Sequence, residues 1–217
     1  MKSILFIIYV TCISFGVYSQ SSCARTVRFG DINICLPVIA GMTECYEESN
    51  IKPVADGMSY PGNSIIAMYF RSSDYRRIEE LDYLDDYVQV FATDKMAYTD
   101  ITNSILDEGL AGITGTYLAK SWEQISSKLD SKSPGLEFGQ PIVVDNYSLT
   151  QNSRTAVLLT PMSDGSGQTF MLMTINLVNL KGRLIYFSHY LNYIGPKTIE
   201  KLKAKNDYFL MILNKEN

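Results

Sequence analysis

Four β-rich segments in the last third of the chain constrain its fold more than any other feature. They cover residues 142–147, 155–160, 169–180 and 183–191. Residues 163–167 are a loop rich in Gly and Ser, and Lys181–Gly182 is a tight turn between the last two segments. Parallel neighbours need a crossover of about a dozen or more residues, so such short connections exclude them. The sequence therefore predicts a four-stranded antiparallel meander.

A helix is expected directly after this meander. Gly195–Pro196 ends the sheet, and Pro196 suits the first turn of a helix, where its missing N–H is not needed. The residues that follow recur at helical spacing: Ile199, Leu202, Asn206, Phe209, Leu210 and Leu213. We therefore expect an α+β fold, in which helices pack on a central antiparallel β-sheet.

The rest of the chain adds further elements to this pattern. Strands are predicted over 27–36, broken at Gly30–Asp31, and over 64–70 and 87–93. Helices are predicted over 73–86, which carries an acidic solvated face, and over 116–130, where Trp122 lies on the apolar stripe. Residues 47–63, 109–115 and 130–141 are rich in Gly or Pro and are expected to be loops. No repeat or linker divides residues 20–217, which we interpret as a single α+β domain.

Residues 1–19 have the pattern of a secretory signal peptide. Lys2 supplies the positive start, Ile4–Val17 is an apolar run of fourteen residues, and Ser19 offers a small residue before the expected cleavage at Gln20. The run is shorter than the roughly 18–20 residues that span a bilayer. We expect a secreted or periplasmic protein with no stable membrane span after cleavage, the alternative being a retained anchor.

Charge argues against a nucleic-acid partner. Removal of Lys2 with the signal leaves 18 basic against 23 acidic residues, a net charge of −5. A nucleic-acid binder needs a clustered basic excess that displaces counterions from phosphates. Four lysines do gather near the C-terminus, but Glu200 and Asp207 lie among them, so they are interpreted as a solvated helix face: Lys197, Lys201, Lys203 and Lys205.

Three cysteines remain after signal removal, so at most one intramolecular disulfide can form. The sequence favours Cys35–Cys45, because Pro37 and Gly41 between them could turn the chain back. Lipidation of Cys23 is the alternative use of that residue, although Gln20 and the two serines do not fit a lipobox. Without CxxC spacing the cysteines do not indicate structural zinc.

Two segments resemble PsbP-like domains. One is Asp31-Ile32-Asn33-Ile34-Cys35-Leu36-Pro37, which is similar to their opening strand. The other runs from Gly182-Arg183-Leu184-Ile185-Tyr186-Phe187 through Tyr193-Ile194-Gly195 to a final helix with Tyr208-Phe209. The resemblance implies an α/β/α sandwich around the antiparallel sheet. PsbP-like domains share no catalytic constellation, so the resemblance assigns no functional residue.

His189 is the only histidine, and it alternates onto the strand face that also carries Phe187, Leu191 and Tyr193. A lone histidine on an aromatic face is interpreted as a hydrogen-bonded structural residue, with a role in binding as the alternative. It excludes sites with several histidine ligands. No nucleophile elbow, phosphate-binding loop or zinc-protease motif is present. The sequence predicts no metal and no cofactor.

Tyrosine supplies the remaining functional signal. The chain has fifteen tyrosines, and Tyr186, Tyr190 and Tyr193 cluster near the end of the sheet. Tyrosine suits both the rim of a core and a recognition groove. We favour a non-enzymatic binding or accessory protein, whose partner is a protein or small ligand in the cell envelope or outside the cell. The alternative is an envelope hydrolase using carboxylates such as Asp145 or Glu137, which need no recognisable motif.

Overall fold

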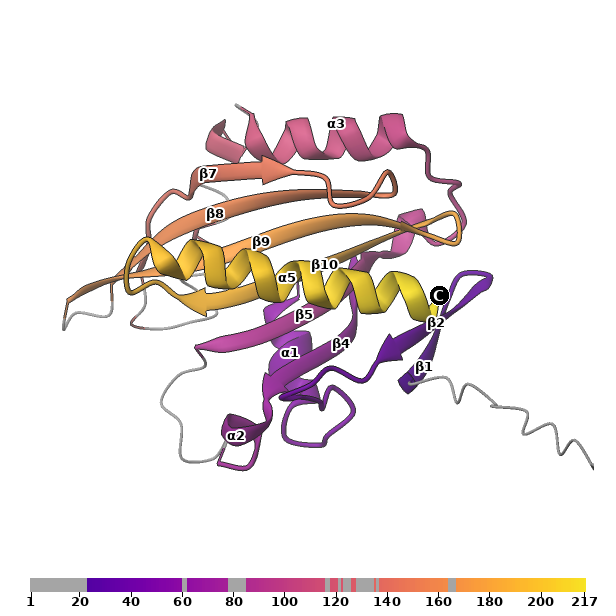
Figure 1. Cartoon of the computed structure of the whole chain (residues 1–217), viewed down its shortest axis with the longest axis horizontal. Helices are drawn as coiled ribbons and strands as arrows, with labels where there is room; N and C mark the ends of the chain where they lie inside the picture. Colours follow the sequence, from indigo (N-terminus) through magenta and orange to yellow (C-terminus); the bar gives the residue numbers. More distant parts are fainter. Residues whose placement is uncertain are drawn as a thin grey trace, which may run out of the picture.

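The computed structural model describes residues 23–59, 62–77, 85–115, 118–120, 122, 126–127, 135, 137–163 and 167–217. Its strands form an eight-stranded sheet and a separate two-stranded hairpin (Figure 1). Its helices pack on the sheet, so the expected α+β class is confirmed. None of the helices in these residues is long and apolar enough to cross a membrane.

Every strand pair of the large sheet is antiparallel. The strands follow the order β3-β4-β5-β10-β9-β8, and both β6 and β7 pair with β8. The predicted meander is β7 to β10, and it forms half of a wider sheet. The strands are β3 (Met42–Glu44), β4 (Asn63–Arg71), β5 (Asp86–Thr93), β6 (Glu137–Phe138), β7 (Ile142–Tyr147), β8 (Ser153–Ser163), β9 (Gln168–Leu180) and β10 (Arg183–Asn192).

The turn between β9 and β10 fixes the register of the sheet centre. Lys181 and Gly182 both have positive φ, 51° and 84°, as a two-residue type I′ hairpin turn requires. Leu180 therefore pairs with Arg183. A slip of one residue would move every side chain of β10 to the opposite face. The short turn that the sequence predicts here thus decides which β10 side chains reach the site.

Helix α5 (Lys197–Glu216) covers one face of the sheet. Its buried apolar side chains pack against alternate residues of β5, β9 and β10, among them Val90, Val178 and Phe187. The hairpin β1 (Cys23–Phe29) and β2 (Ile32–Pro37) adds Ile34 and Leu36 to the same core. The core therefore lies between α5, the hairpin and the sheet (Figure 1).

Shorter helices cover the opposite face. Helix α3 (Asn103–Thr114) buries Leu106 against Leu177 and Leu184, whose side chains point away from α5. Helix α1 (Lys52–Met58) buries Ala55 beneath β4. The remaining short helices are α2 (Ser72–Tyr75), which follows β4, and a 3-10 turn, η2 (Asp94–Met96), which follows β5.

Two segments expected to be loops contain helices. Residues 47–63 include α1, and residues 109–115 belong largely to α3. A Cβ at Gly109 would lie 2.4 Å from Leu177 Cδ2, so this glycine allows α3 to approach β9 closely. Glycine predicts a flexible loop at this position, whereas Gly109 serves packing between a helix and a strand.

The helix predicted over 73–86 is not formed as a whole. Among its described residues, those of α2 are helical and Asp86 already belongs to β5. Residues 78–84 lie outside the described part of the chain. In the helix predicted over 116–130, the described residues 118–120, 122 and 126–127 are helical. Trp122 is half-buried rather than fully enclosed, and the rest of that segment lies outside the described residues.

The disulfide predicted from the sequence is wrong. Cys35 is bonded to Cys23, with a Cα–Cα distance of 5.2 Å, and Cys45 is a buried free thiol. The hairpin brings Cys23 and Cys35 close together because β1 pairs with β2. Cys45 follows β3 instead, and its Sγ donates to the carbonyl oxygen of Met68 at 3.4 Å. Sequence separation does not reveal which strand each cysteine joins.

Candidate functional site

A cleft of about 460 Å³ lies where α5 meets the end of β4, α2 and the loop before β3. Its buried polar residues are Asp86 and His189. Lys205, Arg71 and Arg76 line it with partly or fully exposed side chains. A pocket of this size, with a few convergent polar groups, is typical of a small-ligand site.

Three elements meet at the buried end of the cleft. Asp86 begins β5, His189 lies on β10 and Lys205 lies on α5. The Nε2 of His189 is 3.0 Å from Asp86 Oδ1, and the ammonium group of Lys205 donates to Asp86 Oδ2. The side chains of Asp86 and His189 are each 2% exposed, whereas that of Lys205 is 35% exposed. The carboxylate is therefore held between a buried ring and a cation at the cleft.

These contacts set the protonation states. Burial alone would raise the pKa of Asp86, but the hydrogen bonds from His189 and Lys205 outweigh it and lower that pKa to about 2. Burial lowers the pKa of His189 despite the neighbouring carboxylate. At neutral pH the pair is thus an ionised aspartate and a neutral imidazole. The imidazole donates from Nε2, so Nδ1 is an acceptor, and it has no partner among the described residues.

Arginines form the exposed side of the cleft. Arg71 donates from Nε to Asp74 at 2.8 Å, and its Nη2 contacts Asp85. Its Nη1 makes no hydrogen bond to the described residues. Arg76 donates from Nε to the carbonyl oxygen of Ser72 at 3.2 Å, and within the described chain no carboxylate pairs with it. Arg76 therefore offers charge and hydrogen-bond donors to a ligand.

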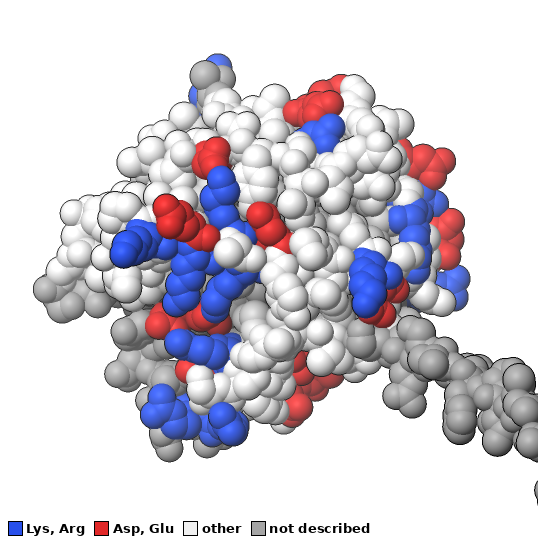
Figure 2. Space-filling model, in the orientation of Figure 1, with Lys and Arg blue, Asp and Glu red and all other residues white. Residues whose placement is uncertain are grey.

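The cleft opens on the most basic part of the α5 face. Figure 2 shows Lys and Arg side chains gathered over the first half of α5 and continuing toward α2, with acidic side chains between them. The sequence suggested that the lysines of α5 form a solvated face, but two of them are paired with aspartates. Lys203 donates to Asp145 at 2.5 Å, and Lys205 reaches Asp86. Lys197 and Lys201 are exposed.

The structure does not bring the four predicted site residues together. His189 and Tyr193 lie on the α5 side of the sheet, as the alternation of β10 predicts, and Tyr186 and Tyr190 lie on the other side. Tyr190 stacks on Tyr87 with ring centroids 4.4 Å apart, and Tyr186 stacks on Phe91 at 5.2 Å.

Tyr193 packs edge-on against Phe170, with ring centroids 6.4 Å apart. The three tyrosines do not line the cleft. Only His189 of the predicted set does. Sequence reasoning missed Asp86 as its partner and Lys205 as the second donor to Asp86, because it placed Asp86 on an acidic helix and Lys205 on a solvated one.

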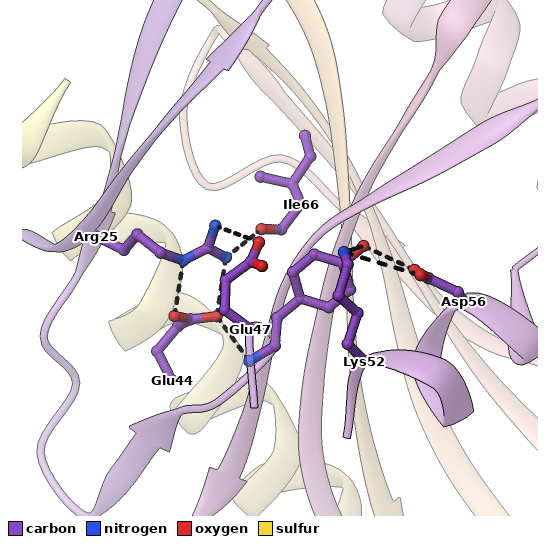
Figure 3. Close-up of polar contacts among 7 residues, drawn as sticks. Arg25, Glu44, Glu47, Lys52, Asp56 and Ile66 are labelled. Atoms are coloured by element: carbon purple, nitrogen blue, oxygen red, sulfur yellow. Dashed lines mark hydrogen bonds and ion pairs between the residues drawn. The ribbon is translucent and has the colours of Figure 1, made fainter. Parts of the chain in front are cut away.

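A second polar cluster ties the hairpin to the rest of the fold (Figure 3). Arg25 on β1 donates to both carboxylate oxygens of Glu44, at 3.0 and 3.1 Å, and to the carbonyl oxygen of Ile66 at 2.6 Å. Nearby, Lys52 donates to the hydroxyl of Tyr46, which donates to Asp56 at 2.7 Å. Cations and anions satisfy one another in this cluster, so its contacts are those of a clamp between β1, β3, β4 and α1.

Across the described residues, no group of three or more His, Cys, Asp or Glu side chains is arranged to hold a metal ion. The cleft brings together the carboxylate of Asp86, the imidazole of His189 and the ammonium group of Lys205, which is not a metal ligand in this contact. The arrangement suits hydrogen bonding and charge recognition.

Comparisons with known proteins give no family. No family model matches the chain, and no curated protein matches it. Among solved structures, a point mutant of protein Mog1 aligns at 10% identity with a TM-score of 0.34, covering 88% of this chain and 91% of that one. The Saccharomyces cerevisiae Ran-binding protein Mog1p aligns at 10% identity with a TM-score of 0.32, covering 88% and 89%.

The resemblance to PsbP-like domains is therefore wrong. No family model matches the chain, and neither of the two solved structures is described as a PsbP-like domain. The residues that carried it belong to β2, to β10 and to α5. A strand ending in proline and a hairpin strand followed by a helix occur in many α+β folds, so these residues do not distinguish one family from another.

Proposed function

We propose that this protein is a secreted or periplasmic, non-enzymatic binding protein whose ligand occupies the cleft beside α5. The cleft of about 460 Å³, with a buried polar end formed by Asp86 and His189, is the observation that carries the proposal. Ligand sites are concave and largely preformed, with a small number of fixed polar groups. Asp86 is fixed here by donors from two other elements, β10 and α5.

The local contacts support binding over carboxylate chemistry. A general acid or base must reach the proton it transfers. Nδ1 of His189 is buried and Nε2 is engaged with Asp86. Of the carboxylates proposed for a hydrolase, Asp145 is paired with Lys203 and Glu137 is exposed on the short strand β6. These two side chains do not line the cleft.

Export is part of the same proposal. The apolar run Ile4–Val17 supplies the signal, and the Cys23–Cys35 disulfide supports an oxidising compartment. Exported material is expected to begin at or within a few residues of Gln20, which N-terminal sequencing measures. Exported protein that still carried Ile4–Val17 would contradict cleavage.

The cleft is tested by blocking it. Ala40 is exposed and lines the cleft, so Ala40→Trp should fill it without entering the core. Val54→Trp places the same ring on α1, at a residue that is 61% exposed on the other side of the sheet. In a fragment screen read by NMR, hits of the wild type should shift resonances of cleft residues, disappear in Ala40→Trp and persist in Val54→Trp. Hits that map elsewhere and survive both substitutions would sink the proposed site.

A further inference from the structure

We infer that the ligand of this cleft is an amphiphile with an apolar body and an oxyanion head, bound head-first toward Arg76 and Lys205. The inference rests on the proposed function, because it assigns a chemical class to the occupant of the same cleft. Two properties of the lining residues carry it: N–H donors of Arg76 and Lys205 that no described residue uses, and apolar side chains beside them.

The donors are unevenly paired. Three cationic residues lie in the described lining: Arg71 is paired with Asp74 and Asp85, and Lys205 with Asp86. Arg76 differs from both, because it has no carboxylate partner among the described residues. An oxyanion accepts several charge-assisted hydrogen bonds in such a place, and arginine forks match carboxylate and phosphate geometry.

The negative charge of Asp86 does not oppose such a head. Its carboxylate is 2% exposed and is held by His189 on one oxygen and by Lys205 on the other. Lys205 has three N–H donors, of which Asp86 uses one. Since the Lys205 side chain is 35% exposed, its ammonium group lies between the buried aspartate and the open side of the cleft. It can therefore serve both the aspartate and a bound anion.

The rest of the cleft is apolar. Ile39 and Met42 line it from the loop before β3, and Phe209 and Tyr208 line it from α5. Tyr208 is 42% exposed and Met42 is partly exposed, whereas Ile39 and Phe209 are almost fully buried. Covering the exposed apolar surface with an alkyl chain is favourable, because it removes that surface from water. A fully polar ligand would leave these apolar side chains exposed to water. A fully apolar ligand would make no hydrogen bond to the donors of Arg76 and Lys205.

The test uses ligands that share one alkyl chain. Octanoate, octyl phosphate and octan-1-ol are titrated below their aggregation concentrations into the exported protein, with NMR shifts of cleft residues as the readout. The two anions are expected to bind about tenfold more tightly than the alcohol, since a charge-assisted hydrogen bond is the difference. The anion that binds more tightly, octanoate or octyl phosphate, identifies the preferred head group as a carboxylate or a phosphate.

Two variants make the assignment specific. Arg76→Gln should weaken anion binding about fivefold to tenfold and leave octan-1-ol unchanged. Arg77→Gln removes the same charge from the next residue, which is exposed and does not line the cleft, and should leave both unchanged.

The outcomes separate the inference from the proposed function. If octan-1-ol binds the cleft as tightly as octanoate, or if Arg76→Gln and Arg77→Gln behave alike, the oxyanion head is wrong while ligand binding in the cleft stands. If none of the three probes shifts cleft residues although the fragment screen finds hits there, the amphiphile is wrong. If Ala40→Trp removes no hit, the cleft itself is not the site.

Discussion

Asp86 is the residue on which the most structure depends. It is almost fully buried, and an unpaired buried carboxylate would be strongly destabilising. Hydrogen bonds from His189 and Lys205 make its ionised form the stable one, so β5, β10 and α5 are joined at a single carboxylate. The same three side chains line the cleft, so stability and ligand binding share these residues.

The protein should therefore lose stability as pH falls, in two stages. The folded pKa of His189 is below the ordinary value of 6.5, so its contribution is present above that pH and is lost as pH falls through the folded pKa. Asp86 titrates near pH 2 instead of 3.8, so its contribution of about 2 kcal/mol is lost between about pH 4 and pH 2. Melting temperature measured from pH 8 to pH 2 checks both stages.

His189→Gln separates the two stages. Glutamine can still donate an N–H toward Asp86, but it does not titrate. The variant should have a lower melting temperature at pH 7.5 and a flatter pH dependence between pH 7 and pH 5, with the loss below pH 4 retained. An unchanged slope between pH 7 and pH 5 would mean that His189 is not the titrating group.

The sequence revealed the face of His189 but not its partner. Alternation along β10 places it with Phe187 and Leu191, as the structure does. Asp86 is 103 residues away, and its partnership depends on β5 pairing with β10 in one register. Periodicity within a segment carries no information about which distant segment will become its neighbour.

At the scale of elements, α5 was predicted well because the helical spacing of its apolar residues indicates directly which side chains are buried. Leu202, Phe209, Leu210 and Leu213 are buried at the expected positions. Asn206, which interrupts that apolar stripe, is also fully buried. It exchanges amide hydrogen bonds with Asn176 of β9, at 2.7 and 3.0 Å. The inner face of α5 is therefore held by a specific polar pair as well as by apolar packing.

Replacing Asn206 with alanine should cost about 1–3 kcal/mol, because Asn176 and Thr174 would lose their partner in a buried place. Urea denaturation measures the loss. The double variant Asn176→Ala/Asn206→Ala is the control, since it removes both halves of the pair. It should cost clearly less than the sum of the two single variants, and strict additivity would show that the two amides do not interact.

Phe209 anchors the same helix through its ring. It lies edge-on to Tyr69 at 5.2 Å and 4.9 Å from Phe187, measured between ring centroids. Phe209→Ala should cost about 3–5 kcal/mol, a large share of the stability of a domain this size. Lys201→Ala, at an exposed position of α5, should leave the melting temperature within about 2 °C of wild type. Equal melting of both variants would mean that α5 is not docked through Phe209.

Helices α1 and α3 were missed for a different reason. Both contain glycine, a residue typical of loops, and α1 starts with Pro53 in its first turn. Tertiary packing overrides these local preferences. Leu106 is fully buried against the sheet, and Gly109 lets the α3 backbone approach Leu177. Local composition indicated poor intrinsic helix formers. It carried no information about the apolar sheet face against which both helices pack.

At the scale of the molecule, the two ends of the described chain are tied together. The side chain of Asn217 accepts from the backbone N–H of Cys35 at 2.8 Å and donates to its carbonyl oxygen at 2.9 Å. Arg183, at the β9–β10 turn, forms two hydrogen bonds to Asp31 at the tip of the first hairpin, each 2.9 Å. The hairpin thus joins the fold through contacts between residues far apart in the sequence, which local patterns could not have indicated.

A disulfide joins the two strands of this same hairpin, and its removal tests how much it stabilises the protein. Cys23–Cys35 closes a short loop between β1 and β2, so its loss should cost about 3 kcal/mol through the freedom gained by the unfolded chain. Cys23→Ser is expected to lower the denaturation midpoint accordingly. Cys45→Ser should leave the disulfide intact, since Cys45 is a free thiol.

Thiol chemistry distinguishes this pairing from the one predicted by sequence. Burial raises the pKa of Cys45 to about 12, so its thiolate is scarce and native protein should resist a thiol reagent. In denaturant without reductant, one thiol of the exported wild type should become reactive toward the reagent, and peptide mapping should place it at Cys45. A reactive Cys23, with Cys35 and Cys45 recovered in one disulfide-linked peptide, would overturn the pairing and with it the covalent link between β1 and β2.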